Sequence, residues 1–591
     1  MKFINYISDT VHASRKISRM FFRKNKALIL MDIFLGLCTE SEKLVGIVMP
    51  AAVIQMIAAQ SGFNKIFLFL LSVSGLTAAL GIVIQMLQRS RSDYGIRAKN
   101  TLYYDLNGKA ARLDMRDCED EESIDEYYKV FDNIYHFSGV DYQIFCTILS
   151  KTISCALMSC VLVSVDWKLF LMIVAIHIIS MLVKARQDET EYRLETKKSE
   201  NTKRQKYLRE LMYDFKAGRE LRIFHSGKWF REKVRHENQQ VHKIDLKIQR
   251  TVFRYGILLG MLKCIQLVLI YVVSIQKYKS GYIVLSSFVM YINATRLITD
   301  SISSIADAIS FLHDISLYYR DFEDFLKRKE TMRESGSLRQ SPESGDESIE
   351  FRNVSFRYPN REEYALENVS FVIRKGETVS IVGNNGAGKS TLIKLMLRLY
   401  DPTEGSILYD GVDIREYDYD FYQSLFAPVF QDYVMYPYTL RENLVFNHVE
   451  NEKNMDGALA KTGLYHKIKG LGLERGYSKR HYEDGVELSG GEEQRFVIAR
   501  ALCKDTGTLI LDEPTAAVDP LAESRLFREI FDAVGSNTVI FISHRMASTR
   551  FSDKVLVLDR AELVEMGTHQ ELLRNDKLYA QMFHQQADYY I

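Results

Sequence analysis

Residues 66–88 form an uncharged apolar stretch that constrains the fold of this 591-residue chain more than any other feature. A helix rises about 1.5 Å per residue, so a helix over this stretch can cross a hydrocarbon core of roughly 30 Å. Up to about residue 326 the chain contains further long apolar runs, whereas the remainder alternates short β-rich runs with helical patterns and glycine-marked turns. Since one hydrophobic core rarely organises so long a chain, the sequence predicts a helical membrane domain followed by an α/β domain.

Six membrane spans are predicted in the first half, at 27–59, 66–88, 152–165, 169–183, 255–275 and 283–305. The first of them is the least clean. Between the spans, segments 89–140 and 184–250 are long and hydrophilic, and their apolar residues keep helical spacing. These two segments are therefore predicted to continue membrane helices into water rather than to form loose loops.

The distribution of positive charge orients the spans, because Lys and Arg accumulate in cytoplasmic loops and flanks. Residues 15–26 carry six basic side chains, whereas the turn before residues 66–88 carries only Lys65. The chain is therefore predicted to be a multi-pass protein of the cell membrane, with its amino terminus and its α/β domain on the cytoplasmic side. Residues 1–26 place apolar residues near one face of a basic helix, which predicts an interfacial helix; a frayed polar terminus is the alternative.

Charge and cysteine usage bear on nucleic-acid binding, disulfides and zinc sites. The net charge of +1 argues neither for nor against a polyanionic partner, and no nucleic-acid partner is predicted. The seven cysteines form no Cys-x-x-Cys pair and no cluster with histidine, which argues against structural disulfides and zinc. No short apolar core with a small-residue cleavage site follows the basic amino terminus, so no signal peptide is predicted.

A phosphate-binding pattern follows the apolar strand predicted at 378–382 and opens a helix at 390–399. Its residues are Gly383, Asn384, Asn385, Gly386, Ala387, Gly388, Lys389, Ser390 and Thr391. The glycines let backbone N–H groups turn towards a β-phosphate, helped by the partial positive charge of the helix start. Lys389 would reach the β and γ oxygens, and the Ser390 hydroxyl would ligate Mg²⁺. The pattern predicts binding of a nucleoside triphosphate.

Two adjacent acids, Asp512 and Glu513, end the apolar strand predicted at 508–511. Ligands of α/β proteins bind at the carboxyl edge of the sheet. Asp512 is therefore expected to hold Mg²⁺ through water, and Glu513 to polarise the attacking water as general base. The alternative is a pair of merely solvated acids, which is common at strand ends.

Residues 488–495, Leu-Ser-Gly-Gly-Glu-Glu-Gln-Arg, lie between these two motifs and open a further helix. Ser489 is placed to cap that helix, and the free N–H groups of Gly490 and Gly491 form an anion site suited to a γ-phosphate. The three motifs together resemble those of an ATP-binding cassette (ABC) ATPase. With six spans and two long inner extensions before them, the chain resembles an ABC exporter half-transporter over nearly its whole length.

The resemblance implies roles for further residues. Tyr358 matches the aromatic residue that stacks on adenine, although a tyrosine at a strand end more often only packs. Gln431 resembles the glutamine that reports Mg²⁺ and the γ-phosphate, His544 resembles the histidine that binds the γ-phosphate, and Asp519 would contact the opposite site. In this family the Ser-Gly-Gly helix completes the site on the partner's phosphate loop. The chain is therefore expected to act as a homodimer or heterodimer of half-transporters.

The predicted fold is a multi-domain membrane protein, in which an all-α six-helix transmembrane domain is joined to an α/β P-loop NTPase of the ABC type. Its parts are an interfacial helix at 1–26, a transmembrane domain at 27–328, a solvated linker at 329–347 and an ATP-binding domain at 348–591. The resemblance also implies short coupling helices near 120–126 and 214–222, where the long inner segments bend and rest on an ATPase domain.

Glu492 departs from the family pattern, which usually has glutamine at this position. One interpretation is a favourable charge in the first helical turn, shared with Glu493. The other is that Glu492 weakens one ATP site in a heterodimer. The sequence leaves both open.

Charged residues inside the predicted spans bear on the cargo, because such residues usually face a cavity or pair with each other. They are Glu40, Glu42, Lys43, Lys263, Arg296 and Asp300. Arg296 and Asp300 have the spacing of an ion pair, and Glu40 or Glu42 opposite Lys263 could be structural. If these residues line a cavity instead, the cargo is polar or amphipathic, such as a peptide.

The predicted function is ATP-driven export of a peptide, drug-like molecule or lipid from the cytoplasm or the inner leaflet, with ATP and Mg²⁺ bound. The partners expected are a second half-transporter, the lipid bilayer and the transported molecule. Two alternatives are import through the same fold and a membrane-anchored sensory ATPase that transports nothing.

Overall fold

The computed structural model describes residues 26–137, 140–163, 167–334, 336–340, 348–359, 361–446, 452–504, 506–513, 528, 530, 531, 535, 537–543 and 545–588. Most of the predicted interfacial helix lies outside these residues, as do Asp519 and His544. The chain divides into two compact units. The helical unit comprises Met1–Lys109 with Glu126–Lys327, and the α/β unit comprises Ala110–Asp125 with Arg328–Ile591.

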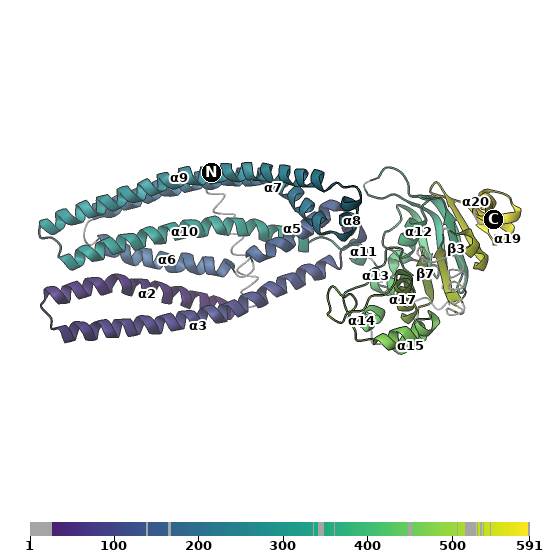
Figure 1. Ribbon diagram of the computed structural model, residues 1–591, viewed down its shortest axis with the longest axis horizontal. Coiled ribbons are helices and arrows are strands. Elements are labelled where there is room, and N and C mark those ends of the chain that lie inside the picture. The colour runs from purple at the N-terminus through teal and green to yellow at the C-terminus, as the bar shows by residue number, and fades with distance from the viewer. Residues whose placement is uncertain are drawn as a thin grey trace. The chain divides into compact units, whose positions relative to one another are not determined.

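Long helices build the helical unit (Figure 1), as the apolar runs predict. The six longest are α2 (Lys26–Ala58), α3 (Phe63–Ala110), α6 (Val140–Val163), α7 (Trp167–Tyr213), α9 (Gly227–Lys279) and α10 (Leu285–Leu326). Each overlaps one predicted span. Among the described residues, α2, α3, α7 and α9 contain segments long and apolar enough to cross a membrane, and α6 contributes the shorter apolar stretch Cys146–Cys160.

The hydrophilic extensions are helical, as their apolar spacing predicts. Helix α3 has 48 residues, α7 has 47 and α9 has 53, each well beyond the roughly 20 needed to cross a bilayer. The chain breaks between α3 and α5 (Glu121–Phe137), where the short helix α4 (Met115–Glu119) intervenes, and again around α8 (Phe215–Ile223). These breaks correspond to the two expected bends, the first of them a few residues earlier than expected.

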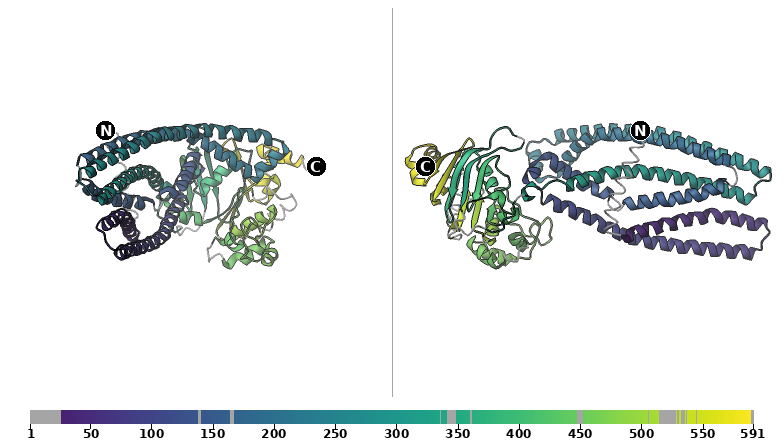
Figure 2. Two further views of the ribbon diagram at one scale, coloured as in Figure 1. Left: turned by 60° about the vertical axis from the view of Figure 1, so that its left-hand side comes forward. Right: turned by 180° about the vertical axis from the view of Figure 1, so that it is seen from behind.

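Packing holds the helical unit together in two groups. Helices α2, α6 and α10 pack against one another, and α7 packs along α9 (Figure 2). A core cluster of Ile47, Leu162, Ile173, Ile270 and Ile298 joins residues from five helices. Apolar side chains along α3, by contrast, are exposed, which suits a surface in contact with lipid.

Glu40, in α2, lies buried at the centre of a polar network. The Glu40 carboxylate, 5% exposed, accepts hydrogen bonds from Lys151 Nζ at 2.8 Å, Lys43 Nζ at 3.0 Å and Ser154 Oγ at 2.7 Å. Of the two possibilities left open for Glu40, a structural pair or a cavity lining, the contacts favour the first, and the partner is Lys151 on the adjacent helix α6. The network gives Glu40 a structural role between α2 and α6.

Two sheets form the framework of the α/β unit. The antiparallel sheet has the order β2-β1-β4-β5, with β1 at Ile349–Phe356, β2 at Leu366–Ile373, β4 at Glu404–Tyr409 and β5 at Val412–Asp413. The larger sheet has the order β10-β9-β3-β8-β7-β6, with β3 at Thr378–Gly383, β6 at Phe426–Val429, β7 at Thr508–Asp512, β8 at Thr538–Ile542, β9 at Lys554–Asp559 and β10 at Glu562–Gly567.

Strands β6, β7, β8, β3 and β9 run parallel. Their apolar runs are buried on both faces, as is typical of parallel strands. The helices of the unit are α12 (Lys389–Met396), α13 (Tyr419–Ser424), α14 (Leu440–Val445), α15 (Glu452–Lys461), α16 (Tyr465–Leu471), α17 (Gly490–Cys503), α19 (His569–Arg574) and α20 (Leu578–Asp588).

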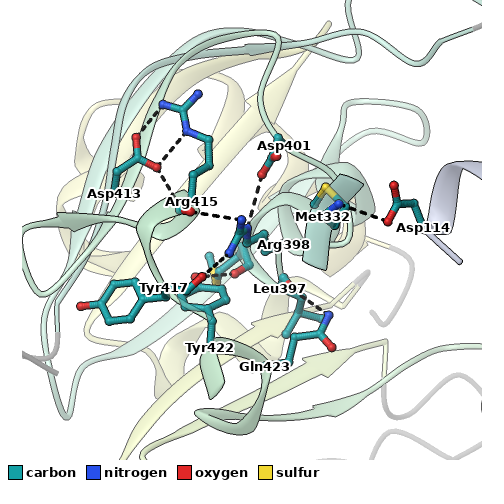
Figure 3. Close-up of polar contacts among 11 residues, drawn as sticks. Asp114, Met332, Leu397, Arg398, Asp401, Asp413, Arg415, Tyr417, Tyr422 and Gln423 are labelled. Carbon is teal, nitrogen blue, oxygen red and sulfur yellow. Dashed lines mark hydrogen bonds and ion pairs between the residues drawn. The ribbon is translucent and has the colours of Figure 1, made fainter. Parts of the chain in front are cut away.

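The linker predicted to be solvated is ordered in its described part. It forms the short helix α11 (Thr331–Glu334), in which Met332 is buried, and Leu338 then pairs with Tyr417. Asp114, from the segment that contains α4, accepts hydrogen bonds from the backbone N–H groups of Thr331 at 3.1 Å and Met332 at 3.3 Å (Figure 3). Residues 110–125 are therefore hydrogen-bonded to the linker within the α/β unit.

A buried arginine contacts Tyr417, the residue with which Leu338 of the linker pairs. Arg398, fully buried, donates to the Tyr417 carbonyl at 2.9 Å and pairs with Asp401 at 3.5 Å (Figure 3). Its neighbour Tyr400 lies close to the site described below. Arg398, just after α12 in the chain, thus contacts Tyr417, which in turn pairs with Leu338 of the linker.

Candidate nucleotide site

The predicted motifs meet at one edge of the larger sheet. Register pairs Ile381 with Ile542, Ile542 with Asp512, and Leu511 with Val429, so strands β3, β8, β7 and β6 end at about the same level. The phosphate loop follows β3, the acids end β7, and Gln431 lies in the turn after β6. Carboxyl ends of parallel strands are where α/β proteins bind ligands.

The phosphate loop has the geometry that anion binding needs. Gly388 has a φ of +102° and precedes α12, and a Cβ there would lie 2.6 Å from the Ala365 carbonyl. A Cβ on Gly383 would lie 2.1 Å from the Leu558 carbonyl. Only glycine fits at these two positions, so the backbone turns tightly and leaves the N–H groups of the α12 start available to a phosphate.

Lys389 is held at the centre of the loop. Its ammonium is mostly buried and donates to the carbonyls of Gly383 at 2.9 Å and Asn384 at 3.0 Å. Burial lowers the pKa of Lys389, and the charges of Glu513 and Asp512 act in the opposite direction. The two acids are thus within electrostatic range of this ammonium, as a shared triphosphate site requires.

The acids occupy distinct positions. Asp512 is the last residue of β7 and is 7% exposed. Glu513 follows it with a φ of +50°, rare for a residue with a side chain, and its N–H donates to the Ile542 carbonyl at 3.2 Å. Such strain is typical of functional positions. The oxygen donors of Asp512 and Ser390 are the type that Mg²⁺ prefers, so the residues present fit this ion.

A cavity of about 350 Å³ brings eight of the predicted site residues together. Its lining includes Tyr358, Asn385, Gly386, Gly388, Lys389, Ser390, Thr391 and Glu513. Gln431 is exposed in its turn and is not one of the lining residues. His544 and Asp519 lie outside the described residues.

Tyr358 is fixed at the wall of this cavity. Its hydroxyl lies 3.2 Å from Thr391 Oγ1, and its ring meets the rings of Phe356 and Tyr400 edge-on. Lys394 Nζ lies 5.5 Å from the centroid of the Tyr358 ring. This fixed, electron-rich ring beside the phosphate loop suits the stacking of a nucleobase.

Glu119 of α4 contacts two residues beside this cavity, Lys394 and Tyr400. Its carboxylate accepts hydrogen bonds from Lys394 Nζ and from the Tyr400 hydroxyl, both at 2.6 Å. Burial alone would raise the pKa of Glu119, but these two donors lower it. A second cavity, of about 550 Å³, lies between α4 and the Tyr358 and Tyr400 rings. No local pattern marks Glu119, because its partners are more than 270 residues away in sequence.

Replacement of Glu119 by glutamine is expected to raise the ATP concentration for half-maximal hydrolysis by roughly threefold to tenfold. The neutral amide would no longer hold the Lys394 ammonium, which would then be free to leave the Tyr358 ring. Steady-state ATPase assays of the purified full-length complex measure this shift. The matched control is Glu122→Gln, which removes an exposed acid from the neighbouring helix; equal behaviour of the two variants would contradict the role of Glu119.

The Ser-Gly-Gly helix start belongs to a different part of the α/β unit. Helix α17 packs with α14, α15 and α16 around a core that contains Leu464, Ile468, Leu488 and Phe496, separate from the core beneath the phosphate loop. Ser489, Gly490 and Gly491 are not lining residues of the 350 Å³ cavity. The Ser-Gly-Gly helix start and the phosphate loop are thus separate within the described part of one chain.

Glu492 caps this helix start. One of its carboxylate oxygens accepts the Ser489 N–H at 3.0 Å, and the other accepts Lys467 Nζ at 2.5 Å. This is the carboxylate half of a capping box, in which a side chain in the first turn satisfies a free backbone donor. The geometry supports the interpretation of Glu492 as a favourable charge in the first helical turn.

Comparison with known proteins places these features in context. A family model described as ABC transporter matches residues 366–516. The chain is 28% identical to the subtilin transport ATP-binding protein SpaT of Bacillus subtilis, over 96% of this chain and 93% of that protein. It is 27% identical to the nisin transport ATP-binding protein NisT of Lactococcus lactis subsp. lactis, over 70% of each.

Other relatives match over a shorter length. The ATP-dependent lipid A-core flippase of Burkholderia orbicola (strain AU 1054) is 37% identical, over 40% of this chain and 39% of that protein. Among solved structures, a bacterial Atm1-family ABC exporter with ATP bound superimposes with a TM-score of 0.79 and 22% identity, over 96% of this chain and 98% of that chain. The similarity of fold thus extends through both units.

Proposed function

We propose that this chain, an ABC exporter half-transporter whose ATP hydrolysis is coupled to transport, carries a peptide out of the cytoplasm together with a second half-transporter. A peptide is preferred as cargo because of the length over which each relative matches this chain. The relatives named for subtilin and nisin transport match over 586 and 426 residues, whereas the lipid A-core flippase matches over 234. Since cargo crosses the membrane domain, matches that extend into that domain favour a peptide of the subtilin and nisin kind.

The site residues divide the chemistry among themselves. Tyr358 stacks on adenine, while Lys389 and the N–H groups of the phosphate loop hold the phosphates. Ser390, Asp512 and Gln431 hold Mg²⁺, which neutralises developing charge on the phosphates. Glu513 takes a proton from the attacking water, and His544 contacts the γ-phosphate. Each of these roles rests on the position of the residue at the sheet edge or in the motif.

The second half-transporter would complete each nucleotide site with residues of its own α17 start. Ser489, Gly490 and Gly491 would face the γ-phosphate on the partner's phosphate loop, with Asp519 at the junction. The separation of α17 from the 350 Å³ cavity within one chain supports this arrangement. Two ATP molecules would then be enclosed between two chains, and their hydrolysis would separate the chains again.

Helix α4 is proposed to transmit the movement of the α/β unit to the helices of the membrane domain. It is attached to the α/β unit through Glu119, and Asp114 beside it holds the linker. It also lies directly between α3 and α5 in the chain, so a displacement of α4 is transmitted to both. The charge pattern of the flanks supports a cytoplasmic α/β unit.

The exposed charges of α2 and α10 favour a polar cargo. Glu42, Arg296 and Asp300 are exposed in segments that coincide with predicted spans, and Lys43 lies within electrostatic range of Asp300. Hydrocarbon would strongly disfavour these groups, so they are proposed to face the translocation path or the partner. An amphipathic peptide could interact with charges of both signs there.

The proposal is tested with the full complex in sealed inside-out vesicles. A labelled precursor of nisin or subtilin is expected to accumulate inside the vesicles only with ATP, and to stimulate hydrolysis. A fluorescent phospholipid and a cationic dye serve as comparison cargos. Accumulation in right-side-out vesicles would support import instead, and peptide-stimulated hydrolysis without accumulation would support a sensory ATPase. Transport of the phospholipid or dye alone would contradict the choice of a peptide.

A further inference from the structure

An ion pair lies directly beside the start of α17. Lys467, on α16, donates to Glu492 Oε1 at 2.5 Å, while Glu492 Oε2 accepts the Ser489 N–H. The Glu492 side chain is 18% exposed and that of Lys467 is 43% exposed. The pair is thus half-covered at the surface that presents Ser489, Gly490 and Gly491.

The position of Glu492 creates an electrostatic conflict for a phosphate at this helix start. Its carboxylate is bonded to the backbone of the same serine that is proposed to face the partner's γ-phosphate. The hydrogen bond from Lys467, followed by that from the Ser489 backbone, lowers the pKa of Glu492 to about 2. The carboxylate therefore remains negative at every working pH, and protonation cannot relieve the repulsion of an incoming phosphate.

The position of Lys467 resolves this conflict. Its neighbour Ile468 is fully buried in the core that also contains Leu488 and Phe496, which flank the helix start on both sides in sequence. Packing therefore places α16 beside the start of α17, and the hydrogen bond to Glu492 Oε1 holds the ammonium against the carboxylate. A charge of opposite sign at hydrogen-bond distance cancels most of the field that a carboxylate exerts a few ångströms further away.

We propose that Lys467 is a positioning residue of the shared ATP site: it neutralises Glu492 so that the α17 start can accept the γ-phosphate held by the partner chain. The inference rests on the proposed two-chain site. It also explains how a glutamate is tolerated where the family usually has glutamine, since the pair as a whole is neutral. Lys467 need not touch ATP to act in this way.

A four-variant series in the purified full-length complex tests this. Lys467→Met is expected to raise the ATP concentration for half-maximal hydrolysis by roughly threefold to tenfold, because it leaves the Glu492 charge uncompensated. Glu492→Gln is expected to lower this concentration, and the double variant to return it close to the wild-type value. Lys469→Met is the matched control, because Lys469 lies on the same helix but pairs with Asp456 on α15 at 2.9 Å.

Two further measurements make the outcome decisive. Photolabelling with an ATP analogue reports binding to each chain's own phosphate loop, and the labelling is expected to be unchanged in all four variants. The melting temperature of each variant shows whether it is folded. An unaltered Lys467→Met enzyme, or a double variant as impaired as Lys467→Met, would overturn the proposal. Ser489→Ala distinguishes its failure from failure of the shared site: if Ser489→Ala also hydrolyses ATP normally, the two-chain site itself is wrong.

Discussion

Glutamine in place of Glu513 is expected to slow ATP hydrolysis by about 10²- to 10⁴-fold while ATP binding is retained. The amide has nearly the same shape as the carboxylate but cannot accept the proton of the attacking water. The strained backbone at Glu513, with a φ of +50° and an N–H bonded to Ile542, would still position the side chain. Phosphate release measures the first effect, and equilibrium binding of ATP measures the second.

The same variant is expected to accumulate as a closed, ATP-bound complex, because in the proposed cycle ATP binding closes the two chains and hydrolysis separates them. Crosslinking of α/β units between chains would report this state. Glu562→Gln, at an exposed position of β10 in the same unit, is the control for loss of an acid elsewhere. Hydrolysis at the wild-type rate in Glu513→Gln would show that another group is the general base.

An aspartate in place of Gly490 is expected to reduce hydrolysis by at least about 100-fold, again without loss of ATP binding to the chain's own phosphate loop. A Cβ at Gly490 would meet no atom within 4 Å, so the new side chain fits without displacing the fold. Its carboxylate would lie at the positive end of α17, where the partner's γ-phosphate is proposed to bind.

Gly490→Asn separates charge from size in this experiment. The amide occupies the same space as the carboxylate, so a much milder loss in Gly490→Asn would identify the negative charge as the cause. Both variants are assayed in the full complex by ATP turnover, and by photolabelling for ATP binding. If Gly490→Asp hydrolyses ATP at the wild-type rate, the α17 start does not contribute to a shared site.

Local patterns were sufficient to predict the helices and the phosphate loop. Hydropathy alone indicates the positions of α3 and α9, because a membrane span needs a long apolar run in the chain itself. The phosphate loop is equally local: Gly383, Gly388 and Lys389 lie within a few residues of one another, and the strand and helix on either side are contiguous with them.

Contacts between distant segments could not be predicted in this way. Glu40 has its partner Lys151 on another helix, and the choice between Lys151 and Lys263 depends on which helices pack together. The linker was predicted to be solvated because its composition is polar. Its order comes instead from specific partners elsewhere in the chain, such as Asp114 for Met332 and Tyr417 for Leu338. Composition does not encode such partners.

Residues 110–125 make the α/β unit discontinuous in the chain, and this has a consequence for its synthesis. Glu119 leaves the ribosome 275 residues before its partner Lys394. At about 5–20 residues per second, the segment waits tens of seconds for the surface on which it docks. Helices α3 and α5 are therefore complete before α4 has its binding surface, and docking of α4 closes a loop of 275 residues, nearly half of the polypeptide. A fragment that begins at residue 348 would lack this segment and would leave Lys394 and Tyr400 without their acid.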